Sequence, residues 1–360
     1  MKTTLSALLL LCLLLPLPAR AGEQAPSLAR YSRDSETLIL FVENDKFLGG
    51  TDEEYTNGLM LTWVSPDLTP GRDAPGQAGW VRALLDELDP WLENFPELYD
   101  PSRQRSVSLS LGQNLYTPRD VYAENPPSDQ RPYAGWLYTT LALHSKDETE
   151  LNTLALTLGI VGPSALGEEV QNNFHNAIGS RRSEGWSHQL HDEPGLMLTW
   201  QRNWRLIVAD LPTGMGFDVL PHAGVTVGNV ATHFNLGGEV RFGFNLPADF
   251  GTALIGPGGG VSAPVAVNSE RLQSSRWWGF HVFAGTDGRA VARDIFLDGN
   301  TWEKSPHVSK EPFVADLLAG AALTLGDVKI TYTQAWRTQE YEGQPDGFHN
   351  FGSLSIAYTF

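Results

Sequence analysis

Asn44, Asp45 and Thr56 are polar residues that stand where two apolar, strand-like runs of the sequence meet. The segment FVENDKFLGGTDEEYTNGLMLTW, residues 41–63, ends one run at Asn44 and Asp45 and opens the next with YTNG. Carboxylate, amide and hydroxyl oxygens at such a place can bind a hard cation such as calcium or orient a catalytic group. The same residue types also simply cap turns. Both interpretations stay open on this segment alone.

A histidine in a second segment could act as a general base. Residues 162–186, GPSALGEEVQNNFHNAIGSRRSEGW, carry a helix start signal at Pro163 and a stop signal at Gly179. Gln171 and His175 are four residues apart, so a helix presents them on one face. A histidine beside an amide, facing oxygen-bearing residues, suits the activation of water. A lone surface-loop histidine is also a common residue without a catalytic role.

Two other groups of residues carry side chains that could take part in chemistry. The sequence HQLHD places His188, His191 and Asp192 at a spacing that suits either a metal trio or a solvated loop. Ser164 and Ser187 are two serines of this region, and neither sits in a G-x-S-x-G motif. Nucleophilic serine catalysis therefore has little support.

The last residues, NFGSLSIAYTF, indicate the elements that position these groups. Leu354, Ile356, Tyr358 and Phe360 fall on one face of an extended chain, and small or polar residues fall on the other. The pattern resembles the terminal strand of bacterial outer-membrane barrels. An edge strand of a soluble sheet is the alternative. Earlier segments repeat the alternation, which favours the barrel.

About twelve segments have strand character, an even number as a closed bacterial barrel requires. We therefore predict an all-β fold, a transmembrane antiparallel β-barrel of about twelve strands with a short helix in an extracellular loop. The candidate strands are 36–43, 56–65, 105–115, 134–144, 151–161, 194–204, 217–228, 232–244, 276–292, 311–324, 328–338 and 350–360.

The first 21 residues predict export. Lys2, a leucine-rich run and Ala19-Arg20-Ala21 form the pattern of a cleaved signal peptide, so residues 22–360 are expected to form a single barrel domain. The one cysteine of the chain, Cys12, lies in the predicted signal peptide. The formal charge of −17 argues against nucleic acid as a partner.

Strand parity predicts where the polar groups lie. If the chain starts on the periplasmic side, the connections that hold Asn44, Asp45, Arg131 and His175 are extracellular, and Thr56 opens a strand at the same rim. Two long connections are then periplasmic. The connection 66–104 contains a helical pattern, which predicts a small helix packed beneath the barrel. The connection 245–275 is glycine-rich and predicts a flexible loop.

Four motifs occur together in order along the chain. They are FVENDKF, YTNG, QRPYAGWLY at 130–138 and GEEVQNNFHNAIG at 167–179. Together with the barrel ending, they resemble the outer-membrane lipid A 3′-O-deacylase family over essentially the whole chain after the signal peptide. The resemblance implies a twelve-stranded barrel with its site between the outer rim and a loop helix. It also implies calcium-dependent hydrolysis of the 3′-linked acyloxyacyl ester of lipid A.

The resemblance also implies roles for individual residues. Asn44 and Asp45 match an essential pair that serves catalysis and calcium binding, and His175 matches the catalytic histidine. Thr56 and Gln171 match site-facing hydroxyl and amide residues. In this chemistry the histidine deprotonates water, and calcium takes up oxyanion charge.

The chain also departs from the family pattern. A basic pair that some relatives place in the second outer loop is not evident, which leaves the substrate-phosphate contacts to other cations. Those available are Arg119, Arg131, Arg181 and Arg182, of which Arg131 and Arg181 are the expected substrate-binding residues. Glu184 is the residue that could take an acidic, third metal-ligand role.

These observations predict a lipid A deacylase of the bacterial outer membrane, with its site facing the outer leaflet. The expected partners are lipopolysaccharide and outer-membrane lipid, and a barrel of this size can serve as a monomer. Two other hypotheses stay open. The first is a catalytically silent barrel with a cation-binding rim, and the second is an esterase or phospholipase that acts on another envelope lipid.

Overall fold

The computed structural model describes residues 35–45, 47, 54–69, 79–95, 97–179, 181–255, 277–345 and 347–360. The side chains of residues 54–56, 177 and 178 lie outside this description, and so does the predicted signal peptide. Among the described residues, no helix has the length and apolar composition that a membrane crossing needs.

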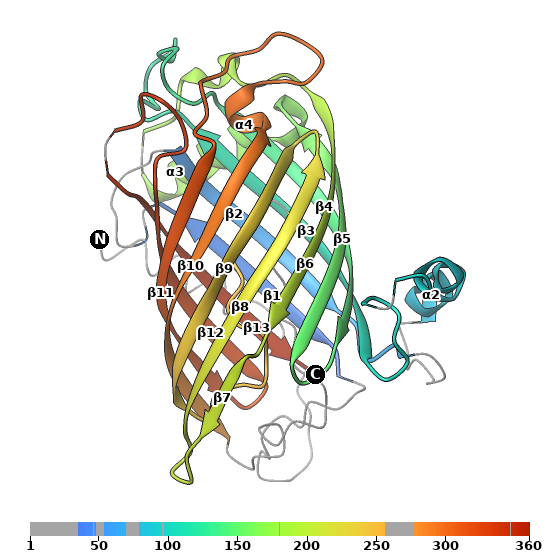
Figure 1. The fold of residues 1–360 in the computed structure, drawn as a ribbon. Helices are drawn as coiled ribbons and strands as arrows, with labels where there is room; N and C mark the ends of the chain where they lie inside the picture. Colours follow the sequence, from blue (N-terminus) through green and yellow to red (C-terminus); the bar gives the residue numbers. More distant parts are fainter. Residues whose placement is uncertain are drawn as a thin grey trace.

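The described strands form one closed antiparallel barrel (Figure 1). Strands that are neighbours in sequence pair, except that β6 pairs with β8 and not with β7, and β1 pairs with β13 to complete the ring. The four-residue strand β7 pairs with the first residues of β8 and continues the line of β6, so the barrel wall has twelve strands, as predicted. The strands are β1 (Thr37–Asn44), β2 (Glu54–Val64), β3 (Gln104–Thr117), β4 (Ala134–Lys146), β5 (Glu150–Val161), β6 (Glu193–Trp204), β7 (Ile207–Asp210), β8 (Met215–Gly228), β9 (Ala231–Phe244), β10 (Trp278–Asp294), β11 (Phe313–Leu325), β12 (Val328–Arg337) and β13 (His349–Thr359).

Alternating side chains give the wall an apolar outer face and a largely polar inner face. On β3, Leu109 and Leu111 are exposed, whereas Ser108 and Ser110 are buried. The Ser110 hydroxyl lies 2.8 Å from that of Thr62 on β2, so cross-strand hydrogen bonds satisfy polar groups inside the barrel. An apolar exterior with a polar interior is the arrangement that a membrane-spanning barrel requires.

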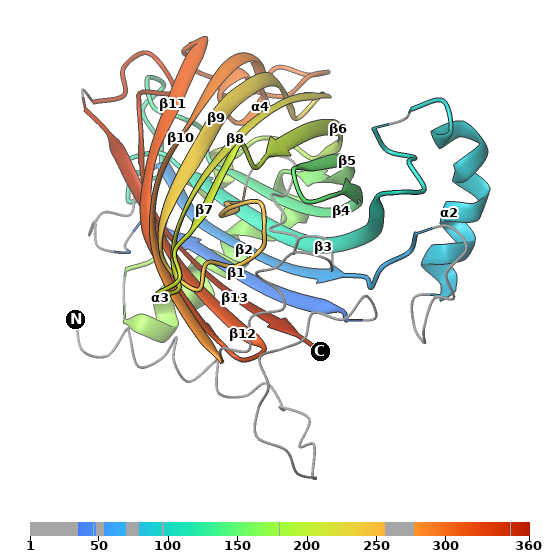
Figure 2. The same cartoon turned by 60° about the horizontal axis from the view of Figure 1, so that its bottom comes forward.

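The start of the connection after β9 differs from the predicted flexible loop. Residues 245–255 enter the barrel (Figure 2). There Asp249 forms ion pairs with Arg241 and, at 2.6 Å, with Lys329. The backbone N–H of Ile255 donates to Glu43 Oε1 at 2.8 Å, near the far end of β1. Buried charged residues of the wall therefore hold this segment in place. The glycine-rich sequence that follows it, at 256–260, had suggested a flexible loop for the whole connection. The remainder of the connection, residues 256–276, lies outside the described residues.

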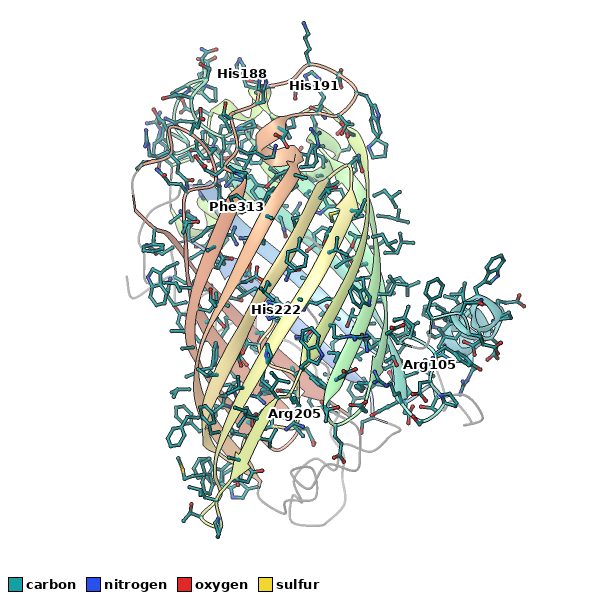
Figure 3. The ribbon with its side chains drawn as sticks, viewed as in Figure 1. Arg105, His188, His191, Arg205, His222 and Phe313 are labelled. Carbon is teal, nitrogen blue, oxygen red and sulfur yellow. The ribbon has the colours of Figure 1, made fainter. Side chains whose placement is uncertain are left out.

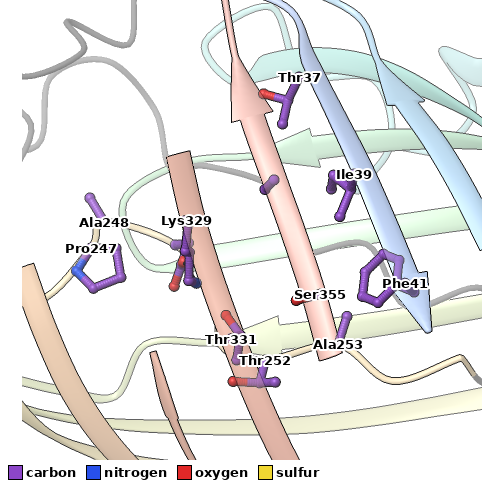
Figure 4. A pocket seen from close by; sticks show the side chains of 12 residues that line it. Thr37, Ile39, Phe41, Pro247, Ala248, Thr252, Ala253, Lys329, Thr331 and Ser355 are labelled. Atoms are coloured by element: carbon purple, nitrogen blue, oxygen red, sulfur yellow. The ribbon is translucent and has the colours of Figure 1, made fainter. Parts of the chain in front are cut away.

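A small cavity remains between this segment and the wall. Its volume is about 40 Å³, and Figure 4 shows Thr37, Ile39 and Phe41 of β1 on one side of it and Pro247 and Thr252 of the inserted segment among the other residues that line it. Among the described residues, the segment 245–255 therefore occupies part of the lumen at this level.

The helix predicted within the connection 66–104 is present, but it lies beside the barrel. Helix α2 (Gly79–Leu92) packs Val81 and Leu85 in one buried cluster with Val107 of β3 and Leu143 of β4. Val107 and Leu143 are register partners and lie on the same, outward-facing side of the wall as Leu109. Helix α2 therefore contacts the outer face of the wall, and Figure 2 shows it standing beside β3. The prediction of a position beneath the barrel was wrong, because outward-facing apolar residues at the base of β3 and β4 offer it a packing surface.

A buried ion-pair cluster ties the loops together at the opposite end. Glu340 lies 3.2 Å from an Arg131 nitrogen and 3.3 Å from an Arg337 nitrogen, and Arg337 also pairs with Asp316 at 2.7 Å. Burial tends to raise the pKa of the Glu340 carboxyl, but the guanidinium groups of Arg131 and Arg337 outweigh it and lower the pKa to about 2. This cluster joins the connection before β4 to the connection after β12.

Acid should weaken this end of the barrel. Because the folded pKa of Glu340 is lowered to about 2 from 4.5, its stabilising contribution is complete above pH 4.5 and is lost as the pH falls toward 2. We expect Glu340→Gln to lower the free energy of unfolding by roughly 3 kcal/mol at pH 7, the cost of removing one partner of a buried ion pair. It should also flatten the loss of stability between pH 4.5 and pH 2.

Urea unfolding in detergent micelles, followed by heat-modifiable gel migration, measures both effects. Glu303→Gln is the matched control, because Glu303 is an exposed rim carboxylate. If Glu340→Gln left the unfolding midpoint at pH 7 unchanged, the cluster would not stabilise the rim.

Candidate functional site

The predicted site residues lie at one end of the barrel, the end that carries helix α3 (Gly167–Ile178) (Figure 1). Asn44 ends β1 and is the register partner of Asn57 on β2, which in turn pairs with Leu115 on β3. Thr56 lies at an irregularity of the same strand pairing, and its side chain is outside the described part. The prediction that these segments meet at one rim is confirmed for their backbones.

Local sequence explains how α3 begins and ends. Pro163–Ala165 forms a single 3₁₀ turn, and Leu166 follows in the left-handed conformation at φ 59° before α3 starts at Gly167. The helix ends at Gly179, which has φ 71°, a conformation that glycine adopts without steric cost. The predicted stop is therefore confirmed, and the predicted start at Pro163 belongs to the preceding turn.

Helix α3 and its preceding turn pack on the outer face of the wall. A Cβ on Gly135 of β4 would stand 3.1 Å from Ala165 Cβ, and a Cβ on Gly167 would stand 2.7 Å from the Trp186 ring and 3.2 Å from Leu115. The two glycines thus permit a close approach that a larger residue would block. Because Leu115 shares the outward-facing side of β3 with Leu109 and Leu111, the buried face of α3 is enclosed between helix and wall on the lipid side of the barrel.

His175 lies on this enclosed face and is only 1% exposed. Its Nδ1 is 2.8 Å from the backbone carbonyl oxygen of Arg181. A carbonyl oxygen only accepts hydrogen bonds, so Nδ1 carries a proton, and in the neutral form of the ring Nε2 carries the lone pair. This is the tautomer that a general base requires.

Gln171 lies one turn before His175 and is 3% exposed. The indole Nε1 of Trp186 donates a hydrogen bond of 2.7 Å to Gln171 Oε1. Because an indole N–H can only donate, this contact also determines which amide atom is the oxygen. Gln171 Nε2 is buried without a hydrogen-bond partner among the described residues. The amide N–H₂ is therefore oriented and available to donate to a bound oxygen.

Loss of the Trp186 donor should impair the site without unfolding the barrel. We expect Trp186→Phe to lower kcat by about tenfold, since the Gln171 amide loses the bond of roughly 1 kcal/mol that orients it. The control is Trp302→Phe, because Trp302 is 68% exposed. Ester hydrolysis, the reaction that a general base at His175 would serve, is assayed in detergent and gives both rates. Equal rates for Trp186→Phe and the unaltered protein would contradict a positioning role for Trp186.

Asp45 and Asn44 supply oxygen donors at the end of β1. Asp45 is fully buried, at 0% exposure, and Asn44 is partly exposed at an outward-facing position of the strand. Among the described residues, no group of three or more His, Cys, Asp or Glu side chains could hold a metal ion. One carboxylate with neighbouring amide and carbonyl oxygens still fits calcium, which accepts neutral oxygen ligands and water. The residues present thus suit calcium better than a nitrogen- or sulfur-seeking metal.

The three charged residues proposed for substrate or metal binding differ in their surroundings. Arg131 is 1% exposed and is held by Glu340 and by the face of the Tyr116 ring, whose centroid lies 5.0 Å away. Arg181 is an exposed cation, with its guanidinium 2.9 Å from Glu184 and over the Tyr122 ring. The surface position of Arg181 suits contact with a substrate anion. The burial of Arg131 does not favour that role, and the salt bridge of Glu184 gives no support to its role as a metal ligand.

The HQLHD residues do not converge on one point. His191 Nδ1 lies 3.0 Å from Glu303 Oε1, whereas Asp192 accepts hydrogen bonds from the backbone and hydroxyl of Ser164. Figure 3 shows His188 and His191 at the outer edge of the rim. Of the two interpretations of this motif, the solvated loop therefore fits, and Asp192 anchors the turn before α3.

Sequence reasoning missed two groups that build the site. The first is Trp186, whose indole N–H orients Gln171. A tryptophan in a polar loop is a signal of a buried contact, and this signal could have indicated it. The other is the backbone carbonyl of Arg181, which orients His175. A carbonyl is common to every residue, so no residue-type pattern could have indicated it.

Comparisons with known proteins identify the family and the fold of this chain. The model of the family described as Outer membrane protein LpxR matches residues 7–360. A solved structure, LpxR from Salmonella typhimurium, superposes with a TM-score of 0.68 at 20% identity and covers 90% of this chain and 100% of its own. The β domain of the Bordetella autotransporter BrkA is less similar, with a TM-score of 0.40 at 11% identity, and covers 90% of this chain and 99% of its own.

A search of curated protein sequences gave no match. The family model spans nearly the whole chain, and the Salmonella structure shares the twelve-stranded fold. The chain therefore belongs to the LpxR family of outer-membrane proteins.

Proposed function

We propose that this protein is a lipid A 3′-O-deacylase that hydrolyses the 3′-linked acyloxyacyl ester. The observation that carries the proposal is the buried His175 ring, whose Nδ1 proton is held 2.8 Å from the Arg181 carbonyl oxygen. A histidine fixed in this tautomer, on a face enclosed between a helix and the outer wall of a barrel, is suited to act on a lipid.

In this mechanism His175 Nε2 takes a proton from water as the water oxygen attacks the ester carbonyl carbon. The new C–O bond gives a tetrahedral intermediate with negative charge on the former carbonyl oxygen. The intermediate collapses by breaking the bond to the sugar 3′-oxygen, and His175 returns its proton to that oxygen. The products are a free acyloxyacyl acid and the 3′-hydroxyl of the sugar, so no covalent enzyme intermediate is needed.

Two neighbouring groups support this chemistry. The Gln171 N–H₂, oriented by Trp186, would donate to the attacking water or to the oxygen that gains charge. Asn44 and Asp45 would hold a calcium ion, which when bound supplies positive charge to polarise the ester carbonyl. Thr56, which opens β2 at the same rim, would position water or substrate.

The location suits a substrate of the outer leaflet. Helix α3 lies against the outer wall, so an acyl chain could approach from the membrane while the sugar stays at the rim. The exposed cation of Arg181 is placed to meet an anionic group of the head region. These features support an orientation in which the α3 end of the barrel lies at the cell surface.

Mass spectrometry of lipid A from cells with and without the protein tests this proposal. Loss of the mass of one 3′-acyloxyacyl group in expressing cells is the expected result. An unchanged spectrum with a folded barrel and millimolar calcium would favour a silent barrel. Fatty-acid release from phospholipid with lipid A intact would indicate an esterase for another envelope lipid.

A further inference from the structure

Helix α2 carries an apolar face that the barrel does not cover. Trp80, Leu88, Trp91 and Phe95 are 53%, 41%, 75% and 56% exposed. These residues, with Leu84, recur every three or four positions from the start of α2 into the turn that follows it, so they form one stripe. We call these five residues the α2 stripe. A stripe of this size exceeds the scattered single exposures that soluble surfaces normally show.

The α2 stripe continues the apolar arc by which the helix packs on the barrel. Val81, Leu85 and Leu92 are the buried residues of α2. At 100° per residue they occupy the arc directly beside the stripe, while Asp86 and Glu93 lie on the opposite side of the helix. The apolar arc is therefore wider than the barrel contact, and its uncovered part points to one side of that contact.

The stripe is also continuous with the lipid-facing surface of the barrel. The Trp80 ring stacks on Trp63, with ring centroids 6.4 Å apart. Trp63 is on the outward-facing side of β2 with the exposed Leu59 and Leu61. The helix thus extends the same apolar surface that contacts membrane lipid around the wall.

Exposed aromatic residues at the same end of the barrel indicate the level of the membrane boundary. Trp278 at the start of β10 and Phe360 at the chain end are 39% and 55% exposed. Aromatic residues gather at membrane–water interfaces because their rings suit the headgroup level. Helix α2 packs on the first residues of β3, so it lies close to this level.

Helix α2 has no free positive charge that would attract anionic lipid. Its one cation, Arg82, donates to the carbonyl oxygens of Leu68 and Thr69 at 2.8 and 3.0 Å. Asp89 is paired with Arg105 at 2.7 Å, which fixes the rotation of the helix on the wall. Binding to a membrane surface would therefore depend on buried apolar area.

We propose that α2 is an interfacial helix that inserts the α2 stripe into the phospholipid leaflet at the end of the barrel opposite to α3. The α2 stripe would contact the headgroups and upper acyl chains of zwitterionic phospholipid. The helix is thereby a second, non-catalytic lipid contact that holds the barrel at a defined depth in the membrane. This inference depends on the membrane-spanning barrel and is independent of the proposed deacylation.

Spin labels on the two faces of α2 test the inference. In a Cys12→Ser background, which has no other cysteine, single cysteines replace Trp91 on the stripe and Asp86 on the polar side. Phe95→Cys provides a second stripe position should Trp91→Cys fail to fold. The full-length protein is reconstituted in phosphatidylcholine and phosphatidylethanolamine vesicles. Collision rates with oxygen and with a water-soluble nickel chelate are then measured for each label.

The expected result is an oxygen-to-nickel collision ratio that is several-fold higher at residue 91 than at residue 86. Equal ratios at the two positions would overturn the proposal. A label at residue 91 that is shielded from both reagents would also overturn it, because a protein partner would then cover the stripe. The readout involves no lipid A hydrolysis, so it is separate from the test of the proposed function.

Discussion

Replacing His175 by alanine is expected to lower lipid A deacylation by about 10²- to 10⁴-fold, the usual contribution of a general base. The ring is buried between α3 and the wall and is held through Nδ1 by the Arg181 carbonyl. Removal of the ring deletes the nitrogen that would take a proton from water. The rate is measured on purified lipid A in detergent, by mass spectrometry of the remaining substrate.

The matched control is His188→Ala, because His188 lies on the same loop but is exposed. It should retain the full rate. Heat-modifiable gel migration shows that both variants fold. A folded His175→Ala variant with the same rate as the unaltered protein would refute the mechanism, and equal losses in both variants would indicate a general disturbance of the loop.

Removal of calcium is expected to abolish the activity, and readdition of calcium to restore it. Asp45 is the fully buried carboxylate beside Asn44, so Asp45→Asn removes the charged ligand while conserving shape. We expect this variant to lose about 10²- to 10³-fold in rate at low calcium, comparable to the loss of an oxyanion-stabilising group.

A shift in the calcium concentration needed for half activity separates metal binding from a structural role. Asp45→Asn should need more calcium, whereas Glu303→Gln at the exposed rim should follow the curve of the unaltered protein. The same experiment on Glu184→Gln tests the third proposed ligand, which we expect to have no effect because Arg181 already pairs with that carboxylate. Full activity of the unaltered protein in EDTA would refute a role for calcium.

Much of the fold could be predicted because the barrel wall repeats one simple rule. Apolar and polar residues alternate along β3, as at Leu109 and Ser110, since one face meets lipid and the other meets the lumen. The prediction of the connections between strands failed where a segment packs against residues that are distant in the sequence. Residues 245–255 enter the lumen because Arg241 and Lys329 lie there to pair with Asp249, and no local pattern encodes that meeting.

In the candidate site, too, the features that depend on local sequence could be predicted, and those that depend on distant contacts could not. The sequence by itself determined the helix that carries Gln171 and His175 on one face, because helical spacing is local. It also determined the polar pair Asn44 and Asp45 at the end of an apolar strand. The family motifs supplied the expectation that these segments work together.

Only the tertiary structure decided the state and surroundings of those side chains. It places α3 against the outer wall through the close approach at Gly135, and it orients His175 with a backbone carbonyl. It also commits Arg131 to a buried ion pair and leaves Arg181 at the surface. The physical reason is that burial and hydrogen-bond partners arise from strands far apart in the chain, which only closure of the barrel brings together.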